Sequence, residues 1–209
     1  MSNAEKSKIL VVDDETSIRN SLAMILKAAG YEASTATDGF DGLLQLRREI
    51  PDVIISDLNM PHMSGFEFLS VVRRRFPEIA VIAVSGAYQY GESVPGGVIA
   101  DAFYSKSQHD PRALLQTVAE LIETKAARIV SHSRLSAPVW IPRNGKDSNG
   151  VPFIVVTCTE CLRSFPQSVI SENLQEIQET ACLFCATPVR YIIDFSRSVS
   201  SPATAKAAA

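Results

Sequence analysis

Short apolar runs alternate with amphipathic segments from residue 8 to about residue 126. The run Ile9–Val12 precedes a segment with apolar positions at helical spacing, and Gly30 ends that segment as a typical helix stop. Four later runs predict further strands, at Tyr31–Thr37, Val53–Ser56, Ala80–Val84 and Ala102–Ser105. The first of these four is the most polar, which favours a place at the edge of a sheet.

Helix-capping residues mark the segments between these strands. Asp38 precedes an apolar helical face, and Asp110 precedes a proline in the first turn of the last helix. Ser64 and Glu67 have the spacing of a capping box. Strands that alternate with helices predict right-handed crossovers and a parallel sheet covered on both faces. We therefore expect an α/β domain with a doubly wound parallel sheet.

Polar residues follow the predicted strands where a doubly wound sheet binds its ligands, beyond the carboxyl ends of the strands. They are Asp13, Asp14, Asp57, Ser85 and Lys106. In the strand order 2-1-3-4-5, strands 1 and 3 are neighbours, so the three carboxylates converge. Converging carboxylates repel one another unless a cation joins them, and Mg²⁺ suits such oxygen ligands together with phosphate oxygens.

Lys106 adds a positive charge to this group, and the Ser85 hydroxyl can donate to an anionic oxygen. The set therefore indicates a carboxylate, Asp57, that accepts a phosphoryl group while a metal and a lysine offset the developing charge. Each residue alone has a plainer interpretation: Asp14 as a helix cap, Lys106 as a solvated surface residue, and Ser85 as a small loop residue. Only their joint occurrence at four strand ends favours the functional interpretation.

These motifs, with Leu58-Asn59-Met60-Pro61 after Asp57 and with Gly65, resemble the receiver domain of two-component response regulators. The resemblance covers about residues 6 to 126 and implies a flavodoxin-like fold with strand order 2-1-3-4-5. It implies that Asp57 is the phosphoacceptor and that Asp13 and Asp14 hold Mg²⁺. The remaining roles that it implies are a backbone carbonyl ligand to Mg²⁺ from Asn59, phosphoryl contacts from Ser85 and Lys106, and a switch aromatic at Phe103. Taken alone, Phe103 is interpreted as a core residue, and we expect it to keep that packing role.

The same resemblance implies a signalling protein rather than an enzyme, with a sensor histidine kinase or a phosphotransfer protein as its partner. Two features depart from the family. Ser107 stands where proline usually follows the lysine, so a cis peptide is not expected there. Residues 87–100 are rich in glycine and lack a helical period, so the family's fourth helix should be short, displaced or absent. A pseudo-receiver that never takes up phosphate remains an alternative.

The C-terminal half has a different pattern, with strand candidates at Val139–Pro142, Val151–Thr157 and Val189–Phe195. Between the last two lie Cys158, Cys161, Cys182 and Cys185, in a C-x₂-C-x₂₀-C-x₂-C spacing that fits tetrahedral Zn²⁺. The segment resembles a zinc ribbon, although Leu162 and Ala186 replace the glycines common after such knuckles. A short helix is expected within Ser171–Glu179. Disulfides, a redox pair and buried thiols are the competing interpretations, and structural zinc is favoured over them.

We therefore expect a receiver domain at 6–126, a linker at 127–138, a β-rich Cys₄ domain at 139–195 and a disordered tail at 196–209. The chain of 209 residues has a formal net charge of −3, and no apolar stretch is long enough for a membrane span. This composition favours a cytoplasmic protein whose thiols stay reduced. Residues 131–209 carry seven basic and six acidic side chains, which favours a protein-interaction module. A transcriptional regulator that binds DNA or RNA through the ribbon is the alternative. Trp140, Phe153, Phe165 and Phe184 could form a recognition surface, but core packing is their expected role.

Overall fold

The computed structural model describes residues 6–86, 100–107, 110–124, 139–140, 150–169 and 176–194. The chain separates into two compact units, Met1–Ser136 and Ala137–Ala209. Of the irregular segment expected at 87–100, only Ala100 falls within the described residues. The expected linker at 127–138 and the expected tail at 196–209 lie outside the described residues. No helix in the described ranges is long and apolar enough to cross a membrane.

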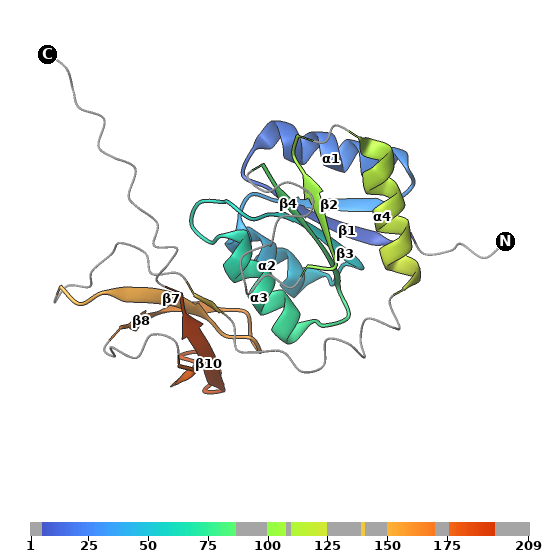
Figure 1. The fold of residues 1–209 in the computed structure, drawn as a ribbon. Helices are drawn as coiled ribbons and strands as arrows, with labels where there is room; N and C mark the ends of the chain where they lie inside the picture. The colour runs from blue at the N-terminus through green and yellow to red at the C-terminus, as the bar shows by residue number, and fades with distance from the viewer. Residues whose placement is uncertain are drawn as a thin grey trace, which may run out of the picture. The chain divides into compact units, whose positions relative to one another are not determined.

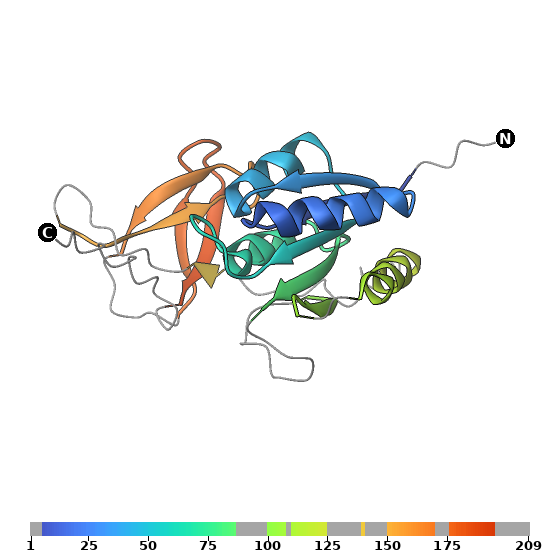
Figure 2. The ribbon, with the colours of Figure 1, turned by 90° about the horizontal axis from the view of Figure 1, so that it is seen from above.

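The first unit contains a five-stranded parallel sheet in the order β2-β1-β3-β4-β5, as predicted. Its strands are β1 (Lys8–Val12), β2 (Glu32–Ala36), β3 (Val53–Asp57), β4 (Ala80–Ser85) and β5 (Ala102–Ser105). Its described helices are α1 (Thr16–Ala28), α2 (Gly39–Arg48), α3 (Gly65–Arg75) and α4 (Pro111–Glu123). Helices α1 and α4 cover one face of the sheet and α2 and α3 the other (Figure 1; Figure 2). The polar strand β2 lies at the edge, also as predicted.

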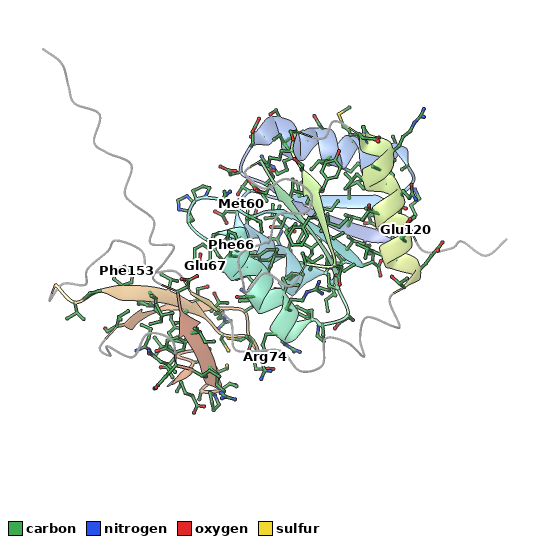
Figure 3. The ribbon with its side chains drawn as sticks, in the orientation of Figure 1. Met60, Phe66, Glu67, Arg74, Glu120 and Phe153 are labelled. Carbon is green, nitrogen blue, oxygen red and sulfur yellow. The ribbon has the colours of Figure 1, made fainter. Side chains whose placement is uncertain are left out.

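The predicted helix starts are confirmed by their caps. Asp38 accepts a hydrogen bond from the backbone N–H of Asp41, and Asp110 accepts from the first turn of α4. Glu67, labelled in Figure 3, completes a capping box with Ser64 at the start of α3. These caps satisfy backbone donors that have no partner inside the helix. They fix where each helix leaves the sheet, next to the strand ends that carry the candidate site.

The core lies on both faces of the three central strands, which are buried along almost their whole length. Alternate residues of a strand point to opposite faces. In β1, Ile9 and Val11 therefore pack with Leu26 of α1 and Val118 of α4 in one buried cluster. Burial on both faces explains why the central strands read as continuous apolar runs in the sequence.

A buried ion pair attaches the start of β5 to its neighbours, and no local sequence pattern indicates it. The Arg73 guanidinium lies 2.5 Å from Asp101 Oδ2 and donates to the carbonyl of Ile79 at 2.9 Å. The same Asp101 oxygen accepts from the backbone N–H of Val81 at 2.7 Å. Both side chains are nearly inaccessible, at 2% and 8% exposed. These contacts join α3, β4 and β5 just before the strand that leads to Lys106.

The second unit is built from short strands. The hairpin β7 (Phe153–Thr157) and β8 (Ser164–Ser168) is antiparallel, and the strand at β8 was not predicted. A second sheet has the order β6-β10-β9, with β6 (Val139–Trp140), β9 (Gln178–Ala181) and β10 (Pro188–Ile193). A short helix was expected within Ser171–Glu179, and that prediction is wrong for its last two residues. Gln178 and Glu179 belong to β9 and pair with β10. Residues 171–175 lie outside the described part.

Candidate functional site

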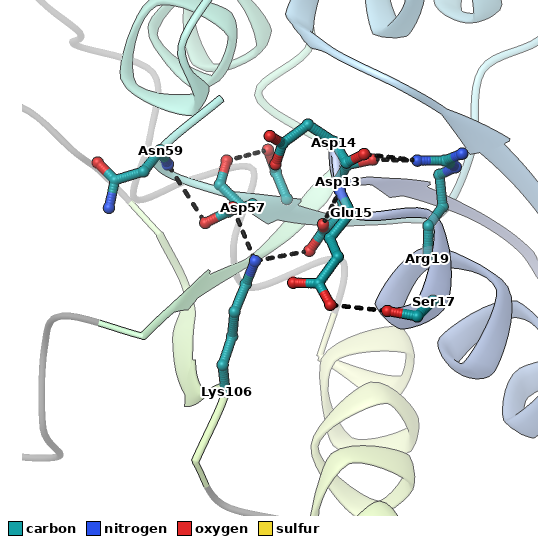
Figure 4. Close-up of polar contacts among 9 residues, drawn as sticks. Asp13, Asp14, Glu15, Ser17, Arg19, Asp57, Asn59 and Lys106 are labelled. Carbon is teal, nitrogen blue, oxygen red and sulfur yellow. Dashed lines mark hydrogen bonds and ion pairs between the residues drawn. The ribbon is translucent and has the colours of Figure 1, made fainter. Parts of the chain in front are cut away.

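The carboxyl ends of β1 and β3 bring the predicted acidic residues together (Figure 4). Val12 is paired with Ser56 in the parallel register, so the next residues, Asp13 and Asp57, leave adjacent strands side by side. One oxygen from each of Asp13, Asp14 and Asp57 lies within 4.8 Å of the others. Asp13 and Asp57 are buried, while Asp14 is exposed. The arrangement predicted from the strand order is therefore present in the structure.

One oxygen of Asp13 lacks a hydrogen bond, although it is buried. Asp13 Oδ1 accepts from the backbone N–H of Glu15 at 2.8 Å, but Oδ2 accepts no hydrogen bond within the described ranges. Lys106 Nζ lies 3.0 Å from this Oδ2, close enough for an ion pair but poorly aligned for a hydrogen bond. Burial raises the pKa of Asp13, and the contacts with Lys106 and Glu15 oppose that effect in part. A buried carboxylate oxygen of this kind fits a bound cation.

Lys106 reaches the acidic residues even though Ser107 replaces the usual proline. Its ammonium donates to Asp57 Oδ2 at 2.8 Å, and its backbone N–H donates to the carbonyl of Ser85 at 3.0 Å. Burial alone lowers the pKa of Lys106, but the hydrogen bond to Asp57 and the nearby charges of Asp57 and Asp13 outweigh it and raise the pKa. The peptide bonds of the described residues are trans, as expected for the bond after Lys106. The lysine is therefore held in its charged form.

Ser85 and Phe103 lie on the two strands beyond Asp57. Ser85 is buried at the end of β4 and is paired with Ser105 of β5. Phe103 lies on β5 with 36% of its surface exposed, so the expectation of a core position for its ring is wrong. β5 is an edge strand with a neighbouring strand on one side only. Its side chains are therefore less completely covered than those of the central strands β1, β3 and β4.

The loop after β3 is tightly fixed against the end of that strand. The backbone N–H of Asn59 donates to Asp57 Oδ1 at 3.2 Å, and the N–H of Leu58 donates to the carbonyl of Val84 at 3.2 Å. Gly65 closes the loop by donating to the carbonyl of Leu58 at 3.1 Å. A Cβ atom on Gly65 would lie 2.8 Å from Leu58 Cα and would overlap the Asp57 backbone. Glycine is therefore required there by close approach, and the loop places Asn59 beside Asp57.

Arg19 holds the loop that carries the acidic pair, a role that sequence reasoning missed. Its guanidinium donates to the carbonyl of Asp13 at 2.6 Å and to the carbonyl of Asp14 at 3.3 Å, as Figure 4 shows. It also donates to Thr16 Oγ1 at 3.2 Å. The only signal available was a basic residue one turn into the helix that follows the acids. Such a residue is usually interpreted as solvated surface. Its acceptors here are backbone carbonyls, which leave no pattern in the sequence.

The four predicted cysteines lie together in the second unit. The Sγ atoms of Cys158 and Cys185 are 3.7 Å apart, as are those of Cys161 and Cys182, and all four lie within 4.8 Å of one another. A tetrahedron with metal–sulfur bonds of about 2.3 Å has edges of about 3.8 Å. A disulfide would need about 2.05 Å, and all four thiols are free. The spacing of the sulfur atoms therefore fits a tetrahedral metal ion.

The thiols differ in their environments. Burial raises the pKa of Cys158 to about 12 and also raises the pKa of Cys161. Hydrogen bonding with the Thr187 side chain and backbone lowers the pKa of the exposed Cys185 to about 6. Metal binding requires thiolates, so a bound cation would favour deprotonation of the buried thiols as well.

The two cysteine pairs lie in turns of the same construction. In the first turn the N–H of Leu162 donates to the carbonyl of Cys158 at 2.9 Å, and in the second Ala186 donates to Cys182 at 3.0 Å. Leu162 and Ala186 have positive φ angles of 54° and 59°. These are the two positions where the sequence lacks the common glycines. The backbone thus adopts the knuckle conformation without them, at a steric cost to each side chain.

The fold and the first site together define a class of protein: a flavodoxin-like α/β domain with an acidic pocket and a lysine at the carboxyl edge of its sheet. The model of the response regulator receiver domain family matches residues 9–130. The chain belongs to this family, and its first unit is a two-component receiver domain. Receiver domains are signalling domains. The match ends at residue 130, before the cysteine unit.

Solved structures of the family support this fold. The receiver domain protein of Methanospirillum hungatei is 31% identical, with a TM-score of 0.52, and the match covers 59% of this chain and 98% of that one. The response regulator TrrA of Thermotoga maritima, in complex with Mg²⁺ and BeF, is 32% identical, with a TM-score of 0.51. That match covers 55% of this chain and 98% of the other.

Several curated relatives are named as transcriptional regulators. The probable transcriptional regulator ycf27 of Porphyra purpurea is 32% identical over 146 residues, which are 70% of this chain and 57% of that protein. The transcriptional regulatory protein PrrA of Mycobacterium leprae is 29% identical, over 69% of this chain and 64% of its own length. The chain spans about half the length of the ycf27 relatives that it matches.

Proposed function

We propose that the first unit, residues 6–126, accepts a phosphoryl group on Asp57 in a reaction that requires Mg²⁺. The observation that carries this proposal is the position of Lys106 Nζ, 2.8 Å from Asp57 and 3.0 Å from Asp13. A lysine at this position provides a fixed positive charge where charge develops during phosphoryl transfer. The same contacts argue against the alternative of a pseudo-receiver, because the substitution at Ser107 leaves the lysine in reach.

Asp13, Asp14 and Asp57, with the backbone carbonyl of Asn59, would hold the Mg²⁺ ion. The buried Asp13 Oδ2, which accepts no hydrogen bond within the described ranges, supports this assignment. When bound, Mg²⁺ supplies positive charge to the phosphoryl oxygens. An Asp57 carboxylate oxygen forms the new bond to phosphorus, and the bond between phosphorus and the leaving group of the donor breaks. Lys106 and the Ser85 hydroxyl contact the transferred group.

The donor in this proposal is a sensor histidine kinase or a phosphotransfer protein, and Phe103 is the aromatic that responds to phosphorylation. The test is incubation of the full chain with Mg²⁺ and acetyl phosphate, followed by intact-mass analysis. We expect an acid-stable, base-labile adduct of one phosphoryl group in the wild-type protein and none in Asp57→Asn. Equal absence of the adduct from both proteins, with Mg²⁺ present, would falsify the proposal.

We further propose that residues 139–195 form a zinc-stabilised module that passes the signal to a protein target, joined to the receiver by a linker at 127–138. The Sγ separations, 3.7 Å for Cys158–Cys185 and 3.7 Å for Cys161–Cys182, match a tetrahedral site and support Zn²⁺. Four thiolates complete the coordination shell, so the metal would be structural. A unit this small buries little apolar surface, and metal binding would supply much of its folding free energy.

Metal analysis tests the zinc proposal directly. We expect about one equivalent of zinc per chain for a four-ligand site, and loss of it in Cys158→Ser. After chelation, hydrogen exchange should become fast in residues 150–194 and stay slow in the central strands of the receiver. A metal-free preparation whose second unit exchanges as slowly as before would rule the site out.

A DNA- or RNA-binding output is the second candidate, favoured by the names of several curated relatives. Binding that falls steeply with salt concentration would support it. No binding to mixed single- and double-stranded nucleic acid at low salt would exclude it. The protein-interaction module remains the preferred proposal, because residues 131–209 are near neutral.

A further inference from the structure

Two large apolar side chains are exposed at the tip of the second cysteine turn. Leu183 is 71% exposed and Phe184 is 50% exposed, although both lie between the cysteines Cys182 and Cys185. Phe184 was expected to pack in the core, and that expectation is wrong. Phe165 of β8 is only 3% exposed, so the same expectation is confirmed for that residue. Large apolar groups next to each other on a small unit commonly mark an interaction surface.

The Phe184 ring is held in place although half of it faces solvent. It packs edge-on against Phe165, with ring centroids 6.4 Å apart and an interplanar angle of 69°. Its backbone N–H donates to Cys182 Sγ at 3.4 Å. A ring that is already held by Phe165 and by its own backbone loses little conformational entropy when a partner covers its exposed side.

An arginine lies over the same ring. The Arg163 guanidinium carbon is 5.4 Å from the centroid of the Phe184 ring, and Arg163 is exposed. Within the described ranges Arg163 has no carboxylate partner. The surface formed by Arg163, Leu183 and Phe184, hereafter the knuckle patch, therefore joins two apolar groups to one positive charge. Aromatic residues and arginine are the side chains most enriched at energetic centres of protein interfaces.

The charged residues of the second unit distinguish between classes of partner. Residues 150–169 and 176–194 contain two arginines and four acidic residues. Nucleic-acid binding depends on several basic groups that contact phosphates. One arginine beside two apolar side chains instead complements a single carboxylate next to a large apolar residue.

We propose that the knuckle patch binds a peptide segment of a partner protein in which Asp or Glu lies beside a large apolar residue. The carboxylate pairs with Arg163, and the apolar side chain covers Phe184 and Leu183. This inference rests on the proposed function of the second unit as a zinc-stabilised interaction module, and it names the surface and the partner chemistry. The cysteine turn sets the positions of both apolar residues, so metal binding would also order the patch.

The test uses the full-length, zinc-loaded protein and a phage-displayed library of random dodecapeptides. We expect selected peptides to contain an acidic residue next to Leu, Ile, Phe or Trp. Binding of a labelled selected peptide is then measured by fluorescence anisotropy. Phe184→Ser and Arg163→Glu should each weaken it by about tenfold or more, as expected for central interface residues. Ile177→Ser is the matched control, because Ile177 is 49% exposed in the same unit but outside the patch.

Several results would overturn the proposal. They are the absence of enriched acidic–apolar peptides, peptide binding that Phe184→Ser leaves unchanged, equal loss in Ile177→Ser, and displacement of the peptide by mixed-sequence oligonucleotides. Zinc content is measured on every variant, so the two proposals fail separately. Zinc present without peptide binding contradicts the knuckle patch alone. Peptide binding by a zinc-free wild-type protein contradicts the zinc module alone.

Discussion

The ammonium of Lys106 lies between two carboxylates from different strands, 2.8 Å from Asp57 Oδ2 and 3.0 Å from Asp13 Oδ2. Both carboxylates are buried, so the single positive charge interacts with two negative ones where water contributes little screening and leaves a net charge of −1. A divalent cation at the same carboxylates would be repelled by the lysine. The lysine and the metal therefore act on the acceptor together but oppose each other in binding.

Replacing Lys106 with methionine should have opposite effects on metal binding and on phosphorylation. Loss of the nearby positive charge should tighten Mg²⁺ binding by about tenfold, which is about 1.4 kcal/mol. Labelling by acetyl phosphate should slow by about a hundredfold, because a fixed cation at the transferred group is lost. Calorimetric titration and intact-mass time courses measure the two effects, with Lys27→Met on α1 as the control. Weaker Mg²⁺ binding in Lys106→Met would contradict this account.

Arg19 should act on the metal through the backbone of the acidic loop. Arg19→Ala removes the donors to the carbonyls of Asp13 and Asp14, so the two carboxylates become less well positioned. We expect Mg²⁺ affinity to fall by about fivefold, on the order of 1 kcal/mol for lost hydrogen bonds. The thermal midpoint measured without Mg²⁺ should change little. The control is Arg47→Ala, an exposed arginine on α2. A lower midpoint with unchanged affinity would show that Arg19 only stabilises the fold.

Gly65→Ala should destabilise the receiver unit by about 1–3 kcal/mol, because the added methyl group overlaps backbone atoms of Asp57 and Leu58. The loop must shift, and Asp57 labelling should fall with it. Urea unfolding measures the stability change. Gly86→Ala provides the comparison, since the nearest atom to its added methyl would be Lys106 Cδ at 4.0 Å. Equal stability of the two variants would mean that the close approach at Gly65 is unimportant.

The ion pair of Arg73 and Asp101 allows a test by double substitution. Arg73→Met leaves Asp101 as a buried carboxylate without its guanidinium partner, which should cost about 3–5 kcal/mol of unfolding free energy. Adding Asp101→Asn removes that charge and still allows the side-chain oxygen to accept from Val81. The double variant should therefore recover part of the loss in urea unfolding. A double variant less stable than Arg73→Met would refute this explanation.

The sequence predicted the receiver fold and its acidic site because both depend on local patterns. Apolar runs identified the strands, and the rule that ligands bind at the carboxyl ends of strands predicted that Asp13, Asp57 and Lys106 lie together. Arg19 and Arg73 were missed for one physical reason. Their acceptors are backbone carbonyls or a side chain distant in sequence, and neither leaves a pattern in the residues nearby.

The second unit shows where pattern reasoning ends. The cysteine spacing predicted that four sulfur atoms would meet, because two tight turns can hold one tetrahedral ion. The same sequence did not distinguish Phe165, which is buried, from Phe184, which is half exposed. In a unit with so small a core, tertiary packing alone decides which aromatic residue faces solvent.

The missing glycines in the cysteine turns lead to a last prediction. Ala186 has a φ angle of 59°, a conformation that costs a residue with a Cβ atom about 1–2 kcal/mol. Glycine would avoid this cost but would lose about 0.5–1 kcal/mol through greater freedom in the unfolded chain. Ala186→Gly should therefore stabilise the second unit by up to about 1.5 kcal/mol. Ala186→Val should destabilise it, since a β-branched residue tolerates positive φ poorly. Hydrogen exchange in β10 of the zinc-loaded protein measures both changes, and the reverse order of the two variants would show that these turns carry no such strain.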